Sequence, residues 1–280
     1  MSGTLYLCAT PIGNLGDITL RTLETLKNVD LIAAEDTRRT LTLLNHFEIH
    51  APLTSYYEHN KAQKGKVLIE QLLEGKNIAL VSDAGMPGIS DPGQMLVESC
   101  VKHNIRVEAL PGASACLTAL IASGLDTSRF AFEGFLSMNR TGRAERLQEV
   151  KNEPRTLIFY EAPHKLIATL KDMLDVWGNR RIVLARELTK KYEEYRRTTL
   201  QDALEYYETN PPKGEFVLII EGKNPDELAN EQRLQMPSPE ELLNRYAGEG
   251  MRGRELVKKV AEELNLPKRE VYDLHLKLKK

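Results

Sequence analysis

The chain has 280 residues, enough for more than one domain, and 41% of them are hydrophobic and 28% charged, as in an ordinary soluble globular protein. A formal net charge of −2 excludes a global basic field that would attract nucleic acid. No apolar stretch approaches the roughly 20 residues that span a bilayer, and the N-terminus lacks the basic and apolar regions of a signal peptide, so we expect a cytoplasmic protein without membrane contact.

The N-terminal part alternates between strand-like and helix-like segments. Strands are expected at residues 4–10, 30–36, 77–83 and 106–112, and helices at 17–29, 62–76, 93–104 and 114–124. Asp17 stands where an N-cap of the first helix would lie, and Gly124 where the last helix would end. This alternating order predicts a mostly parallel sheet covered by helices.

A second α/β region follows. Its expected strands are residues 129–136, 155–162, 180–189 and 214–222, and its expected helices are 144–150 and 164–178. We therefore predict two α/β domains, at residues 1–112 and 113–223, followed by a polar linker at 224–236.

The segment 237–280 has a different character. Ser238, Pro239 and Glu241 form the capping-box pattern of a helix start, and a basic helix is expected to begin at Lys268 and Arg269. These features predict a small all-helical domain that resembles a helix-turn-helix unit. Two interpretations stay open here: Lys268 and Arg269 contact RNA, or the helices cap the rest of the chain.

The three cysteines, Cys8, Cys100 and Cys116, are odd in number and widely spaced. This pattern favours buried free thiols over a zinc site or a disulfide framework. We therefore predict no metal site.

Several loops follow expected strands, where ligands bind in open parallel sheets. Residues 9–19 contain two glycines but form neither a GxGxxG motif nor a P-loop. Residues 82–93 hold three glycines, two prolines and two aspartates, which favours a ligand wall over a simple acidic turn.

Two further loops carry small or charged residues. Residues 109–120 place Ser114 and Ala115 at an expected helix start, which leaves room for a ligand over the amides. Glu161, His164 and Lys165 cluster after the strand at 155–162, either as acid/base groups or as surface charge.

Together, the segments "TPIGNLGD", "AAEDTRRT", "VSDAGMPGISDPG", "LPGASA" and "FYEAPHK" resemble the tetrapyrrole methylase-like (class III) S-adenosylmethionine methyltransferases. The similarity covers residues 3–223, and the tail is similar to the C-terminal helical domain of one branch. That branch methylates the ribose 2′-oxygen of a cytidine in 16S ribosomal RNA of the small ribosomal subunit. The segment "TPIGNLGD" departs from the GxGxGD-like loop of the corrinoid-making relatives, which favours the ribosomal RNA branch.

The resemblance implies a homodimer with S-adenosylmethionine in a cleft between the two α/β domains. Carried over by position, the cofactor-binding residues are Pro11, Asp83, Gly85, Met86, Ser114, Ala115, Tyr160, Ala185 and Phe216. From the charged residues themselves, we predict Glu35, Glu161 and Lys165 as catalytic residues. We predict Arg38, Arg39, Lys268 and Arg269 as RNA-binding residues.

Transfer to a ribose hydroxyl needs an acceptor for its proton, and we expect Glu35 or Glu161 in that role. Two alternatives stay open. A tetrapyrrole C-methyltransferase would carry a GxGxGD-type loop and lack a basic tail. A noncatalytic RNA-binding protein on the same fold would have no affinity for the cofactor.

Overall fold

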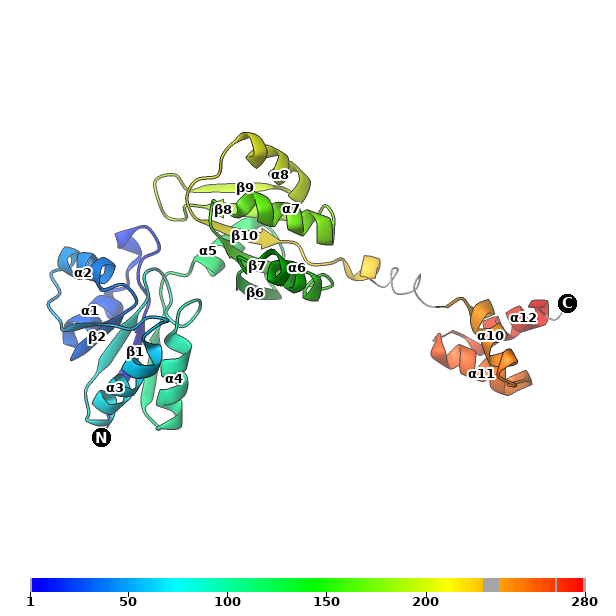
Figure 1. Ribbon diagram of the computed structural model, residues 1–280, viewed down its shortest axis with the longest axis horizontal. Helices are drawn as coiled ribbons and strands as arrows, with labels where there is room; N and C mark the ends of the chain where they lie inside the picture. The colour runs from blue at the N-terminus through cyan, green and yellow to red at the C-terminus, as the bar shows by residue number, and fades with distance from the viewer. Residues whose placement is uncertain (1, 229–236, 265, 279–280) are drawn as a thin grey trace. The chain divides into compact units, whose positions relative to one another are not determined.

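The computed structural model describes residues 2–228, 237–264 and 266–278. Contacts between residues divide the chain into two compact units, Met1–Gly222 and Lys223–Lys280 (Figure 1). Both sheets belong to the first unit, so a folding boundary between residues 112 and 113 stays a prediction. Of the expected linker 224–236, residues 229–236 lie outside the described residues.

The first sheet is parallel throughout and has the order β3-β2-β4-β1-β5. Its strands are β1 (Thr4–Cys8), β2 (Leu31–Ala34), β3 (Leu53–Ser55), β4 (Ile78–Val81) and β5 (Arg106–Leu110). The parallel sheet predicted from the sequence is confirmed. The edge strand β3 was not expected, because three residues are too few to show a periodic pattern.

Helices cover both faces of this sheet. They are α1 (Leu20–Asn28), α2 (Thr37–His46), α3 (Lys61–Leu73) and α4 (Gly93–Lys102). One core joins α3 and α4 to one face of the sheet, and a second core joins α1 and α2 to the other (Figure 1). Cys8 and Cys100 are buried free thiols in these cores, as expected.

The start of α1 differs from the expectation. The N-cap is Thr19, whose hydroxyl accepts a hydrogen bond from the Thr22 amide at 3.1 Å. Asp17 lies instead in the short 3-10 helix η1 (Leu15–Asp17). The prediction of Asp17 as the cap was therefore wrong, because two residues with capping side chains stand close together and only Thr19 precedes the helical backbone.

The second sheet is mixed, with the order β6-β7-β10-β8-β9, and only the β6–β7 pair is parallel. Its strands are β6 (Phe130–Phe135), β7 (Thr156–Glu161), β8 (Arg181–Arg186), β9 (Glu194–Thr199) and β10 (Phe216–Ile220). Sequence reasoning missed β9, because its residues, EYRRTT, lack a buried apolar pattern. As an edge strand, β9 needs little apolar character.

The faces of this sheet are covered unequally. The helices α6 (Arg140–Glu149), α7 (Leu166–Trp177) and α8 (Leu200–Thr209) share one core with one face. The other face packs on α5 (Ala115–Ser123), which ends at Gly124 with a φ of 78°, as predicted. The expected α/β architecture is therefore confirmed for both sheets.

The second unit contains α10 (Pro239–Gly248), α11 (Gly253–Glu263) and α12 (Lys268–Leu278) around an apolar core of its own. The capping box predicted at Ser238 and Glu241 is present. The expected helical C-terminal part is therefore confirmed. Within residues 2–228, 237–264 and 266–278, no helix combines the length and apolar composition that crossing a membrane requires.

Candidate functional site

Three loops that follow β1, β4 and β5 meet at one edge of the first sheet. Thr10 and Gly85 exchange two backbone hydrogen bonds, each 3.0 Å long. The Thr10 hydroxyl also donates to the carbonyl of Ser82 at 3.1 Å. A side chain on Gly112 would lie 2.5 Å from the Cβ of Ala9, so the third loop lies against the end of β1. The three loops therefore converge at this edge.

Gly85 is required where these loops meet. Its φ of +82° lies in the left-handed region. An added Cβ would lie 3.3 Å from the Ile12 Cγ2 and 3.4 Å from the Ala113 carbonyl oxygen. The loop 82–93 therefore approaches the other two loops closely through a residue without a side chain.

Asp91 fixes the remainder of the loop 82–93. Its carboxylate accepts hydrogen bonds from the amides of Gly88 at 2.9 Å and Gly93 at 2.8 Å. An added Cβ on Gly93 would lie 2.9 Å from the Gly88 nitrogen. The density of glycines and aspartates in this loop is thus accounted for by an ordered fold, in which one aspartate satisfies the turn amides.

These loops and the adjacent ends of the second sheet enclose a cavity of about 590 Å³, a volume typical of small-molecule sites. The lining residues that were expected from the sequence are Glu35, Arg39, Asp83, Gly85, Met86, Ser114, Ala115, Tyr160, Glu161, His164, Ala185 and Phe216. Lining residues that were not expected from the sequence include Ile12, Ile89, Phe135, Leu188 and Lys190.

Five of the predicted site residues lie elsewhere. Pro11, Arg38 and Lys165 are not part of the cavity lining, although a neighbour of each one is. Lys268 and Arg269 are exposed residues of the second unit. The Arg38 guanidinium pairs with Asp36 at 2.8 Å.

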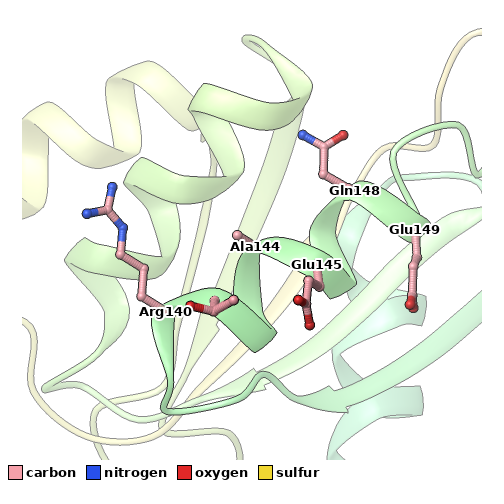
Figure 2. Close-up of a pocket in the computed structure, with 6 residues that line it drawn as sticks. Arg140, Ala144, Glu145, Gln148 and Glu149 are labelled. Atoms are coloured by element: carbon pink, nitrogen blue, oxygen red, sulfur yellow. The ribbon is translucent and has the colours of Figure 1, made fainter.

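A second hollow, of about 640 Å³, lies along α6 (Figure 2). All of its lining residues belong to that one helix, from Arg140 to Glu149. A surface formed by one helix cannot enclose a ligand, whereas the cavity at the loops is bounded by both sheets. The cavity at the loops is therefore the candidate site.

Asp83 ties together the ends of β2 and β4. One of its carboxylate oxygens accepts from the Asp36 amide at 3.0 Å, and the other pairs with Arg39 at 3.1 Å. A carboxylate has about four acceptor positions, so Asp83 retains capacity for a ligand. Arg39 remains largely exposed at the cavity.

Glu35 lies beside Asp83 in the cavity lining. Its carboxylate accepts a long hydrogen bond of 3.4 Å from the Asp83 amide. Partial burial raises the pKa of Glu35, and the negative charges of Asp83 and Asp91 raise it further. A carboxylate with a raised pKa is a better proton acceptor at neutral pH than an ordinary one.

Glu161 is differently arranged. It is only 3% exposed, and its two oxygens accept from the Thr169 hydroxyl at 2.6 Å and from the Ala162 amide at 2.9 Å. These hydrogen bonds join the end of β7 to α7. They favour a positioning role for Glu161 over proton transfer.

The start of α5 meets Tyr160 of β7. The Tyr160 hydroxyl accepts from the Cys116 amide at 3.3 Å, and burial raises the pKa of this tyrosine. Ser114, the N-cap residue, makes no capping hydrogen bond through its side chain. The first turn of α5 therefore presents small residues and a positive helix end to the cavity.

The loop that follows β8 also lines the cavity, through Leu188 and Lys190. Glu187 and Thr189 have φ values of 51° and 64°, which is uncommon for residues other than glycine and strained for a β-branched one. Lys190 bridges Glu187 at 3.0 Å and Glu215 at 2.9 Å. Sequence reasoning missed this loop, because backbone strain leaves no mark in a single sequence.

The family model described as Tetrapyrrole (Corrin/Porphyrin) Methylases matches residues 4–204. The chain belongs to this family. A relative from Halalkalibacterium halodurans, named Ribosomal RNA small subunit methyltransferase I, is 52% identical over 98% of this chain and 94% of its own length.

A second relative and one solved structure show how much of the chain is shared. A Thermotoga maritima relative of the same name is 46% identical over 79% of this chain and 99% of its own length. A crystal structure of uroporphyrin-III C-methyltransferase from Thermus thermophilus, in complex with S-adenyl homocysteine, has a TM-score of 0.55 at 16% identity and covers 79% of this chain and 98% of that one. The methylase fold thus corresponds in length to the α/β unit, Met1–Gly222.

Proposed function

We propose that the protein transfers a methyl group from S-adenosylmethionine to the ribose 2′-oxygen of a cytidine in 16S ribosomal RNA of the small ribosomal subunit. The observation that carries the proposal is the composition of the cavity. Eight of the nine expected cofactor-binding residues, all except Pro11, line it together with Glu35. The ribosomal RNA methyltransferases that share about half of this chain's residues support the choice of substrate.

The residues of the cavity fit S-adenosylmethionine. Apolar side chains of Ala185, Leu188 and Phe216 suit a flat adenine ring. Asp83 retains acceptor capacity for ribose hydroxyls, and the first turn of α5 suits a carboxylate. When bound, the cofactor supplies a methyl group activated by a sulfonium.

The protein contributes positioning and a proton acceptor. Glu35 accepts the proton that the ribose hydroxyl loses when its oxygen is methylated, because its carboxylate is half-buried, lies in the cavity and has a raised pKa. Arg39, exposed at the same cavity, holds a phosphate of the RNA next to the target ribose. Much of the rate comes from holding the two substrates in line.

The alternatives have less support. The first loop, TPIGNLGD, lacks the pattern expected of corrinoid-making relatives. A noncatalytic protein would not need a half-buried carboxylate beside an enclosed cavity.

The same proposal includes a cytoplasmic homodimer whose tail contacts RNA. On α5, Leu117 is 47% exposed and Ile121 is 76% exposed within one chain. A helix that is apolar on all sides is expected to be covered on all sides. We propose that a second copy of the chain packs against these exposed residues of α5.

The test combines cofactor binding with mapping of the product. Calorimetry with S-adenosylmethionine should show binding. Labelled cofactor and small subunits from a strain lacking the enzyme should then yield one labelled cytidine that resists alkaline cleavage on its 3′ side. Label on a base would overturn the ribose assignment, and transfer to a tetrapyrrole but not to subunits would favour the alternative.

A further inference from the structure

The strand β6 carries an irregularity next to the cavity. Its pairing with β7 shifts between Phe132 and Gly134, so that Glu133 is an extra residue. Gly134 has a φ of +67°. Bulges of this kind redirect side chains and are common near active sites.

The bulge changes the direction of Phe135. In a regular strand, residues three positions apart point to opposite faces of the sheet. Here Phe132 pairs with Ile158 and Phe135 with Tyr160, and those partners are two apart on β7. Both phenylalanines therefore lie on the face that bears α5 and the cavity.

The Tyr160 ring contacts both phenylalanine rings. It packs edge-on against Phe132 at 5.0 Å and against Phe135 at 5.4 Å, with interplanar angles of 70° and 62°. Such edge-to-face contacts fix the orientation of an aromatic ring. On the other side of the bulge, Glu133 pairs with Arg146 of α6 at 2.6 Å, which anchors the strand to that helix.

Phe135 nevertheless remains 59% exposed, although it lines the cavity. Among the described residues that line the cavity, Ile89 is the other large apolar residue with an exposed side chain, at 52%. Phe135 comes from the second sheet and Ile89 from the loop after β4. A rigid aromatic ring and an aliphatic side chain, both exposed to solvent at one cavity, suit the two faces of a flat ring.

We propose that Phe135 is the stacking platform for the base of the target nucleotide, with Ile89 on the opposite face. This inference rests on the proposed function and assigns the part of the site that holds the RNA base. Stacking on aromatic side chains is the usual way in which proteins hold an unstacked base. The adenine of the cofactor is also a flat ring, but the high exposure of Phe135 assigns it to the substrate that arrives from solution.

The test uses Phe135→Ala, Phe135→Leu and Phe135→Trp in the full chain. Methyl transfer is measured over a range of concentrations of small subunits that lack the modification. We expect Phe135→Ala and Phe135→Leu to lower kcat/KM roughly 5- to 150-fold, as removal of base stacking does, mainly through KM. Phe135→Trp should retain activity, because it keeps an aromatic face.

Phe130→Ala is the matched control. Phe130 lies on the same edge strand and is 38% exposed, but it is not part of the cavity lining. Its activity should equal that of the wild type, and all variants should bind S-adenosylhomocysteine as the wild type does.

Three results would overturn the inference. Unchanged kcat/KM in Phe135→Ala would show that the ring does not hold the substrate. An equal loss of S-adenosylhomocysteine affinity would assign the ring to the cofactor. A wild-type protein that binds the cofactor but methylates no subunit would remove the proposed function, and this inference with it.

Discussion

The carboxylates that line the cavity differ in the hydrogen bonds that they already accept within the protein. Asp83 and Asp91 accept hydrogen bonds from backbone amides that shape the loops, and Glu161 is bonded through both oxygens. Glu35 accepts only a long hydrogen bond and has a raised pKa. The difference between Glu35 and Glu161 lies in their surroundings, which explains why the sequence alone could not choose between them.

We expect Glu35→Gln to lower kcat roughly 100-fold or more, the usual effect of removing a general base. In the wild type, activity should fall as the pH drops through the raised pKa of Glu35, so the acid limb should lie above the pH at which an ordinary glutamate is half protonated. The pH profile of kcat/KM checks this. Glu24→Gln, an exposed position on α1, should keep the wild-type profile.

Glu35→Gln should also stabilise the protein at neutral pH. A pKa that is raised in the folded state means that folding favours the protonated carboxyl, so Glu35 lowers the stability once the pH exceeds its pKa. Replacement by an uncharged amide removes this penalty. Thermal melting should give a higher Tm for Glu35→Gln than for the wild type at pH 7, and an equal or lower Tm would contradict the assignment of its environment.

Thr169→Val tests the buried carboxylate of Glu161. The valine cannot donate the 2.6 Å hydrogen bond, and a buried acceptor that loses its partner costs about 1–3 kcal/mol. Denaturant unfolding should show this loss. Thr209→Val, at an exposed position in α8, should change the free energy of unfolding by less than about 0.5 kcal/mol.

At the scale of the elements, apolar runs and turn residues were enough to predict most strands, because buried strands must be apolar whatever their partners. The parallel first sheet followed from the alternating order. The antiparallel pairs of the second sheet could not be predicted from that order, because the direction of pairing depends on how β10 inserts between β7 and β8. The bulge that directs Phe135 was equally hidden, since it arises from the register of two strands.

Gly85→Ala tests how the loops are joined. The left-handed backbone should cost about 1–2 kcal/mol, and the added Cβ would lie 3.3 Å from the Ile12 side chain, so that Ile12 must shift slightly. We therefore expect both lower stability and weaker binding of S-adenosylmethionine in calorimetry.

Gly124→Ala separates these two effects. Gly124 has a similar φ of +78°, but nothing lies within 4 Å of its added Cβ. It should lose similar stability and keep the cofactor affinity of the wild type. Equal loss of affinity in both variants would indicate that general destabilisation, and not the contact between loops, is responsible.

At the scale of the whole molecule, the basic residues that begin α12 are exposed, and we expect them to contact RNA phosphates. The double change Lys268→Ala and Arg269→Ala should weaken binding to small subunits and reduce the salt dependence of log K by about 1 to 2. Filter binding over a series of salt concentrations measures this. Cofactor affinity should stay unchanged, because these residues belong to the other compact unit.

Lys66→Ala and Lys76→Ala together form the matched control, since both lysines are exposed in the α/β unit. Their removal subtracts the same charge. A salt dependence that fell equally in both double variants would mean that net charge, and not the tail helix, sets the affinity.

The separate apolar core of the three C-terminal helices has a further consequence. A module that stabilises itself can be shortened, exchanged or lost over evolutionary time without disturbing the chemistry next to it. The Thermotoga maritima protein, which this chain matches over only 221 residues, is what such modularity would produce. The residues that line the cavity and the RNA contact that we propose for α12 then lie in stretches of one gene that can change independently.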